Sequence, residues 1–249
     1  MFLDKDDSEK PGKEIIHNLY YFQEKPMLDC NQYIVNNDET NEISVFDAGN
    51  ALSLVGLLKG MDNLKLNCKN ISKIFLTHEH VDHVLGIYKL MNILKDNPPE
   101  IYAYGNAAKV LEKGDRVKIL PIALGLTERR FGINITPLQV TDLSNFKEIE
   151  VSPDFKFQIH STPGHSPGSV SFYEAKKKVL ISGDVVFVGG SFGRFDFPGG
   201  SLQTLINSIK FINNLDVKYI FPGHMRISEN GNTSIALSLR MIESMGSYY

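Results

Sequence analysis

The stretch that decides the fold is Thr77-His78-Glu79-His80-Val81-Asp82-His83, which directly follows the short apolar run 71–76. The apolar run predicts a buried strand. The residues after it place His78, His80, Asp82 and His83 within six positions, where side chains can converge without competing with core packing. Apolar residues then recur at helical spacing from Val84 to Leu94, which predicts a helix.

Similar polar residues follow apolar runs further along the chain. Thr162-Pro163-Gly164-His165-Ser166-Pro167-Gly168 fixes a turn around one histidine. Ser182-Gly183-Asp184 and Pro222-Gly223-His224 each come just after an apolar strand-like run. Any one of these residues alone would be read as structural. All of them in order, at the ends of strands, indicate one functional site.

Imidazole nitrogens and carboxylate oxygens are good ligands for zinc and other first-row metals. Four such groups within the six residues from His78 to His83 are more than one tetrahedral ion can take from so short a stretch. The residues therefore indicate either two ions, or one ion with supporting residues around it.

The order of elements outside these loops favours two sheets packed face to face, with helices on the outside. No Pro- or Gly-rich linker divides the chain, so we expect a single domain over 1–249. The segment 114–150 is expected to be an irregular insertion with one or two strands, serving as a lid or an oligomer contact. Strands are expected at 15–22, 32–36, 43–47, 71–76, 101–104, 155–160, 168–173, 178–182 and 217–221, and helices at 50–61, 105–113, 201–213 and 233–245.

Composition limits the partners. The 26 Lys and Arg residues against 29 Asp and Glu residues leave a net charge of −3, which argues against nucleic acid or an anionic membrane as partner. Two cysteines cannot form a disulfide framework, and we read Cys30 and Cys68 as ordinary small residues. No run spans a bilayer and the charged N-terminus lacks a signal-peptide core. We expect a soluble cytoplasmic protein with a small-molecule substrate, and a homo-oligomer is possible.

These motifs, together with Phe46-Asp47-Ala48-Gly49 and Gly183-Asp184-Val185-Val186-Phe187, resemble the metallo-β-lactamase fold superfamily. The closest resemblance is to its glyoxalase II-like hydrolase branch. It covers roughly residues 15–245 and weakens across 114–150. The resemblance implies an α/β fold, a four-layer αββα sandwich of two mixed sheets with a dinuclear metal site between them.

The resemblance also implies the ligands. His78, His80 and His165 would hold one ion, Asp82, His83 and His224 the other, and Asp184 would bridge them. Asp47 would orient the histidine-rich loop without touching metal. The cofactors would be two divalent cations, zinc by first choice, with iron or manganese as alternatives.

The implied chemistry is attack of a metal-bridging hydroxide on a thioester or ester carbonyl, with Asp82 and Asp184 as catalytic residues. Arg194 is a candidate for binding an anionic group of the substrate, because a guanidinium suits a carboxylate. Its alternative role is an ordinary salt bridge. Only residues 225–249 follow His224, enough for one helix, so a glutathione-binding C-terminal domain like that of glyoxalase II is not expected.

Three alternatives stay open. A persulfide dioxygenase would use a single iron on His78, His165 and Asp184, and shares a Gly-Arg-x-Asp-Phe stretch like 193–197. A lactonase would carry tyrosine where this chain has Phe187. A nuclease is disfavoured by the charge balance.

Overall fold

Two β-sheets divide the strands according to their order in the sequence. The computed structural model describes residues 8–26, 28–120 and 125–246. The first sheet has the order β1-β2-β3-β4-β5-β6-β7 and the second has the order β12-β11-β10-β9-β8. The strands of the first sheet are β1 Gly12–Ile16, β2 Leu19–Phe22, β3 Gln32–Asn36, β4 Ile43–Phe46, β5 Ile71–Phe75, β6 Glu100–Ala103 and β7 Thr141–Asp142. Those of the second are β8 Glu148–Ser152, β9 Phe155–Ser161, β10 Val170–Glu174, β11 Val179–Gly183 and β12 Tyr219–Pro222.

Both sheets are mixed. In the first sheet β1 to β4 pair antiparallel, whereas β4, β5, β6 and β7 run parallel. In the second sheet only β11 and β12 are parallel. The parallel strands matter for function, because the carboxyl ends of parallel neighbours lie at the same edge of a sheet and the loops that leave them gather there.

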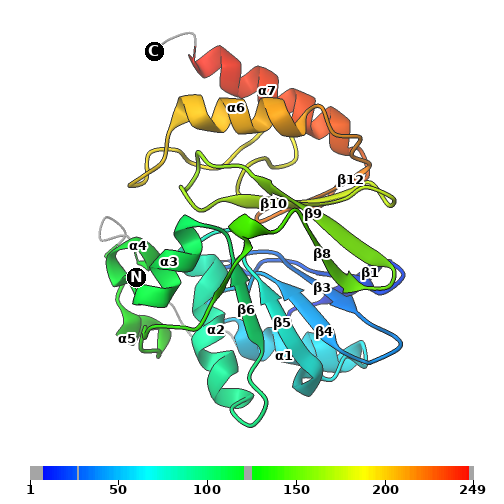
Figure 1. The fold of residues 1–249 in the computed structure, drawn as a ribbon, viewed down its shortest axis with the longest axis vertical. Helices are drawn as coiled ribbons and strands as arrows, with labels where there is room; N and C mark the ends of the chain where they lie inside the picture. The colour runs from blue at the N-terminus through cyan, green and yellow to red at the C-terminus, as the bar shows by residue number, and fades with distance from the viewer. Residues whose placement is uncertain (1–7, 27, 121–124, 247–249) are drawn as a thin grey trace.

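Helices cover the outer face of each sheet. The helices are α1 Leu54–Asn63, α2 Val81–Ile93, α3 Asn106–Lys113, α4 Arg116–Ile119, α5 Glu128–Phe131, α6 Leu202–Ile212 and α7 Gly231–Gly246. Short 3₁₀ helices lie at Cys68–Asn70 and Leu143–Asn145. Figure 1 shows α6 and α7 above the second sheet, and α1 and α2 on the far side of the first. None of the described helices is both long and apolar enough to cross a membrane.

Strand alternation explains why the layers hold together. On β4, Val45 packs toward the helices of the first half, and its neighbour Phe46 packs between the sheets. On β11, Ile181 packs between the sheets and Leu180 packs against α6 and α7. Both faces of these strands are therefore buried, as expected for sheets covered on two sides. The predicted four-layer αββα sandwich is confirmed.

Aromatic rings fill the space between the sheets. Phe46 lies 5.3 Å from Phe75 on the neighbouring strand and 5.2 Å from Phe172 of the opposite sheet, measured between ring centroids. Phe157 approaches Phe46 to 5.0 Å from the same opposite sheet. Contacts of this kind add to the free energy gained by burying the rings, so the two halves of the chain are joined by one apolar layer beneath the loops.

The expectation of one strand over 15–22 was wrong, because the chain turns within this range. The structure divides it into the hairpin β1–β2, with register pairs from Gly12 with Phe22 to Ile16 with Leu19. Asn18 turns the chain in the left-handed region, at φ 64°. Asparagine tolerates this conformation, and the apolar residues on both sides hid the turn.

Two helix starts also differ from expectation. The helix expected at 50–61 begins at Leu54, because the Asn50 side chain accepts hydrogen bonds from the backbone N–H groups of Leu52 and Ser53 and forms a turn first. Helix α2 begins at Val81, with His80 as its N-cap residue. Asp82 and His83 therefore lie in the first turn of a helix and not in a loop.

The segment 114–150 belongs to both sheets. It supplies β7 at the edge of the first sheet and the first residues of β8 at the edge of the second. These two strands agree with the expectation of one or two strands in this segment. Ile119 and Phe131, from α4 and α5, are buried in the core of the first half. Residues 121–124 of this segment lie outside the described residues, and its role as a lid or oligomer contact stays a prediction.

A buried lysine, Lys10, ties the N-terminal segment to the residues that precede β3. Lys10 is fully buried, and its ammonium group donates to Asp29 Oδ2 at 2.8 Å, to the Cys30 carbonyl at 2.8 Å and to Gln32 Oε1 at 2.7 Å. Asp29 Oδ1 also accepts a hydrogen bond from the Ser53 hydroxyl at 2.7 Å. All three protons of Lys10 thus have acceptors, as a buried charge requires.

Replacing Lys10 by methionine leaves the Asp29 carboxylate buried without its cation. We expect Lys10→Met to lower the free energy of unfolding by about 3–5 kcal/mol, measured by urea denaturation. The matched control is Lys156→Met, because Lys156 pairs with Glu148 at 2.6 Å on the surface. That change should cost no more than about 1 kcal/mol. Equal losses in the two variants would show that burial of the Lys10 pair does not matter.

Candidate metal centre

All seven predicted ligands come together at one edge of the sandwich. They form overlapping clusters whose nitrogen and oxygen atoms lie within 4.8 Å of one another within each cluster. The clusters that contain only predicted ligands are His78 with His80 and His165, Asp82 with His83 and His224, and His78 with His83 and Asp184. The first two match the two ligand sets implied by the resemblance.

Asp184 lies between the two predicted sets. Its Oδ2 is 3.5 Å from His165 Nε2 and 3.2 Å from His224 Nε2, and its Oδ1 is 3.4 Å from His83 Nε2. One carboxylate thus faces histidines of both sets, as a bridging ligand must. The close fit depends on Gly223, where an added Cβ would lie 2.2 Å from Asp184 Oδ1.

Hydrogen bonds at the outer nitrogens turn the inner nitrogens toward the centre. His165 Nδ1 lies 2.6 Å from the Arg194 carbonyl, His83 Nδ1 lies 2.8 Å from Asp47 Oδ2 and His224 Nδ1 lies 2.6 Å from Glu24 Oε2. Each of these oxygens can only accept, so the ring must donate from Nδ1. In the neutral form of each ring the lone pair then lies on Nε2, which is the atom that can bind metal.

Asp47 holds the first histidine loop, as predicted. Its Oδ1 accepts from the backbone N–H of Thr77 at 2.8 Å, and its Oδ2 accepts from the Thr77 hydroxyl at 2.8 Å as well as from His83. Because the Thr77 proton is used on Asp47, its oxygen can accept from His78 Nδ1 at 3.1 Å. Asp47 adopts a left-handed backbone, at φ 60°, a strained conformation of the kind found at functional sites.

The donor set fits metal ions. His83 Nε2 and Asp184 Oδ1 are buried, and among the described residues neither has a hydrogen-bond partner. In the first histidine set, His165 Nε2 lies 2.8 Å from His80 Nδ1 and 3.2 Å from His78 Nε2, so nitrogens of all three rings meet at one point. Buried polar atoms without partners are costly, and a cation between them would remove that cost.

The pKa values of the first histidine set suit ligand binding. Burial lowers the pKa of His80 to about 3 and lowers the pKa of His78 well below its usual value. Both rings are therefore neutral at neutral pH. Burial raises the pKa of Asp184, but the neighbouring His224 and His83 outweigh this effect and lower it well below its usual range, so the carboxylate is ionised.

Cys30 also lies near the site, with Asp47 and His83. Burial raises the pKa of its thiol to about 11, and a thiol binds metal well only as the thiolate. Within this cluster, His83 Nδ1 is already hydrogen-bonded to Asp47 Oδ2 at 2.8 Å. These observations support the reading of Cys30 as a small buried residue.

Two supporting carboxylates were missed by sequence reasoning. Glu24 follows β2 and accepts from both His224 Nδ1 and the Met225 backbone N–H. Glu79 is buried and accepts from Asn106 at 2.8 Å and from the Ser166 hydroxyl at 2.9 Å, which ties the two histidine loops together. Glu79 stands inside the decisive motif, but no signal in the sequence pairs Glu24 with a residue 200 positions away.

Five of the seven predicted ligands line a cavity of about 380 Å³. His80, Asp82, His165, Asp184 and His224 all contribute to its lining. Arg194 lies at the rim, where it donates to Asp196 from Nε at 2.9 Å and from Nη2 at 2.6 Å. The salt-bridge role considered for Arg194 is thus present in the structure.

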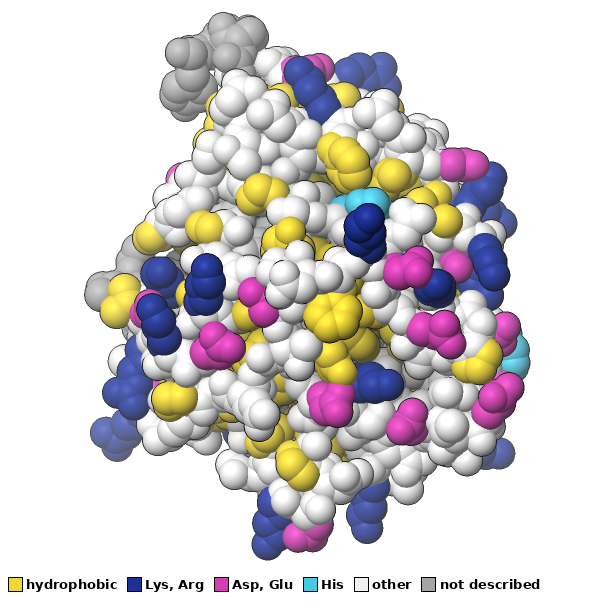
Figure 2. Space-filling model, in the orientation of Figure 1, with side chains coloured by type: hydrophobic (Ala, Val, Ile, Leu, Met, Phe, Trp, Pro, Cys, Tyr) yellow, Lys and Arg dark blue, Asp and Glu magenta, His cyan; other side chains and the backbone are white. Residues whose placement is uncertain are grey.

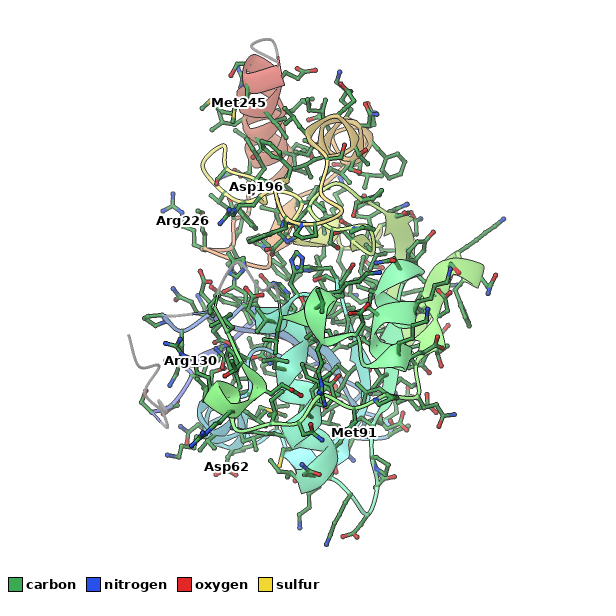
Figure 3. All side chains as sticks on the ribbon, turned by 90° about the vertical axis from the view of Figure 1, so that its left-hand side faces the viewer. Asp62, Met91, Arg130, Asp196, Arg226 and Met245 are labelled. Atoms are coloured by element: carbon green, nitrogen blue, oxygen red, sulfur yellow. The ribbon has the colours of Figure 1, made fainter. Side chains whose placement is uncertain are left out.

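The charged side chains labelled in Figure 3 lie in both halves of the molecule, with Arg226 in the same half as Asp196. Figure 3 shows Asp196 in the loop between β11 and α6 and Arg130 well apart from it, in the other half of the molecule. On the face shown in Figure 2, basic and acidic side chains are interspersed over the surface.

Comparison with known proteins agrees with the site. Residues 26–224 match the Metallo-beta-lactamase superfamily. The chain is 31% identical over 179 residues to hydroxyacylglutathione hydrolase GloC of Haemophilus influenzae, covering 71% of this chain and 76% of that protein. The chain therefore belongs to the metallo-β-lactamase superfamily, with relatives of the glyoxalase II type.

Two solved structures extend the comparison. BLEG-1, a B3 metallo-beta-lactamase, superposes with a TM-score of 0.67 at 30% identity, covering 86% of this chain and 95% of that one. TTHA1623, solved in a di-iron-bound form, superposes with a TM-score of 0.65 at 29% identity, covering 84% and 94%. These relatives support a metal-binding hydrolase and leave zinc against iron undecided.

Removing the Glu24 carboxylate should weaken metal binding, because His224 would lose the acceptor that fixes its ring. We expect Glu24→Ala to lower metal affinity about 10- to 100-fold, measured by competition with a chromophoric chelator. Glu24→Gln keeps one acceptor oxygen, so its metal affinity should fall between those of Glu24→Ala and the unchanged protein. A Glu24→Ala protein with unchanged affinity would contradict this role.

Proposed function

We propose that this protein hydrolyses a thioester or ester with two divalent cations, held by His78, His80 and His165 on one side, by Asp82, His83 and His224 on the other, and by Asp184 between them. The observation that carries the proposal is the convergence of these side chains beside the cavity, where His83 Nε2 and Asp184 Oδ1 lie 3.4 Å apart and neither has a hydrogen-bond partner among the described residues.

Bound there, two divalent cations would lower the pKa of a shared water toward neutrality and polarise the substrate carbonyl. The chain's own residues would position the water and accept its proton. Asp82 lines the cavity and lies 3.3 Å from His224 Nε2, so its carboxylate can also orient a water molecule and accept its proton. Asp184 holds the two halves of the site in register, and Asp47 fixes the ring of His83.

The choice of carbonyl chemistry is supported by the relative named for hydroxyacylglutathione, an acyl thioester. We infer zinc as the first choice of metal because imidazole and carboxylate ligands suit it. Iron is the alternative, since TTHA1623 holds two irons in the same fold.

Metal content tests the dinuclear assignment. We expect two metal ions per chain in the purified protein and no more than one in His224→Ala, because that variant breaks one ligand set; elemental mass spectrometry gives the count. His17→Ala is the matched control, since His17 lies on the surface with 75% of its side chain exposed. Chelation should abolish hydrolysis, and readdition of a divalent metal should restore it.

Hydrolysis that survives complete metal removal would overturn the proposal. A single iron per chain, with oxygen uptake on a persulfide, would instead support the dioxygenase alternative.

A substrate panel tests the reaction class. We expect kcat/KM to be higher for acyclic thioesters or esters than for a β-lactam or a lactone, and lower by at least an order of magnitude for a phosphodiester, because the proposed site stabilises an acyl transition state. Thiol release, followed with a colorimetric reagent, measures the thioester rate. A higher rate on the β-lactam would move the assignment toward BLEG-1.

A further inference from the structure

The cavity above the ligands is walled by apolar side chains. Its polar groups lie at the floor and belong to the proposed ligands, apart from Arg194 at the rim. The apolar wall consists of Leu28, Val81, Phe187, Phe192, Phe197 and Met225. These residues come from separate parts of the chain, so the apolar character is a property of the folded cavity and not of one motif.

Two aromatic rings flank the two ligand sets. Phe197 meets His80 edge to face, with 5.4 Å between ring centroids, and lies 6.3 Å from His165. Phe187 meets His224 in the same way at 5.7 Å. A group bonded to a carbonyl at the floor of the cavity would therefore extend between phenyl rings, where an apolar group loses contact with water and a charged group loses its hydration.

Arg194, the cation at the rim, is already paired with the Asp196 carboxylate. Arg194 uses Nε and Nη2, the edge that would grip a carboxylate, on the two oxygens of Asp196. Its guanidinium also lies 4.4 Å above the centroid of the Phe197 ring, a favourable cation–π arrangement. The pair carries no net charge, and a substrate carboxylate would have to displace Asp196 to use it.

We propose that the acyl group of the substrate is apolar, and that the substrate is a thioester or ester of a short aliphatic or aromatic acid and not of a dicarboxylic acid. This proposal rests on the hydrolase function proposed above. In the reaction the oxygen of water bonds to the acyl carbon, the carbon–sulfur or carbon–oxygen bond breaks, and the leaving thiol or alcohol takes up a proton. The acid that forms releases the second proton of the water to solvent and remains as the carboxylate.

A pair of matched substrates tests the proposal on the metal-loaded protein. Butyryl and succinyl thioesters of N-acetylcysteamine share a neutral leaving thiol and a four-carbon acyl group, and differ in a terminal methyl against a carboxylate. We expect kcat/KM to be at least tenfold higher for butyryl. Across acetyl, butyryl and hexanoyl thioesters, kcat/KM should rise by up to about fourfold for each added methylene.

Variants test which side chains set this preference. Asp196→Asn releases Arg194, so the ratio of succinyl to butyryl activity should rise. Phe192→Ala should lower kcat/KM for hexanoyl more than for acetyl. Phe146→Ala is the matched control, because Phe146 is a phenylalanine 45% exposed and outside the cavity lining; it should leave the hexanoyl-to-acetyl ratio unchanged.

Three outcomes are distinct. Faster hydrolysis of succinyl than of butyryl, or a flat acyl series, would overturn the apolar substrate class and leave the hydrolase intact. If no thioester or ester is cleaved, the proposed function fails, and calorimetric binding of the acids still decides the cavity's preference. Tighter binding of butyrate than of succinate would support the apolar pocket, and the reverse order would refute it.

Discussion

Seven polar side chains share one small volume at the edge of the sandwich, and much of the surrounding structure serves to hold them there. The fold fixes the imidazole rings through hydrogen bonds at their outer nitrogens, as between Asp47 and His83 or Glu24 and His224. The aromatic layer around Phe46 provides the rigid base.

The ligands are drawn from both halves of the chain. His78 and His80 belong to the first sheet and the turn after it, whereas His165, Asp184 and His224 follow strands of the second. The centre is therefore complete only when the two sheets pack correctly, and cations bound there would stabilise that packing by mass action. The buried Lys10 ties the N-terminal segment to the same region.

The layers, and the polar residues that converge at their edge, could be predicted because their signals are local. An apolar run followed at once by His, Asp and Gly marks a strand end, and Asp184 and His224 show this as clearly as His78 does. Contacts that depend on tertiary closure gave no such signal. Glu24 meets His224 only after the whole chain has folded, and the turn at Asn18 was masked by apolar neighbours that satisfy a longer strand equally well.

The walls of the cavity and its floor are anchored differently. The floor residues sit at strand ends and in the first turn of α2, whereas Phe192 and Phe197 lie in the loop between β11 and α6, and Leu28 lies in the loop before β3. Asn31 supports the Met225 side of the wall through the backbone carbonyl of Met225, at 2.7 Å, and not through its side chain. Selection can therefore exchange the wall side chains while the ligands stay in place. A single scaffold of this kind can acquire new specificities through small changes, without rebuilding its chemistry.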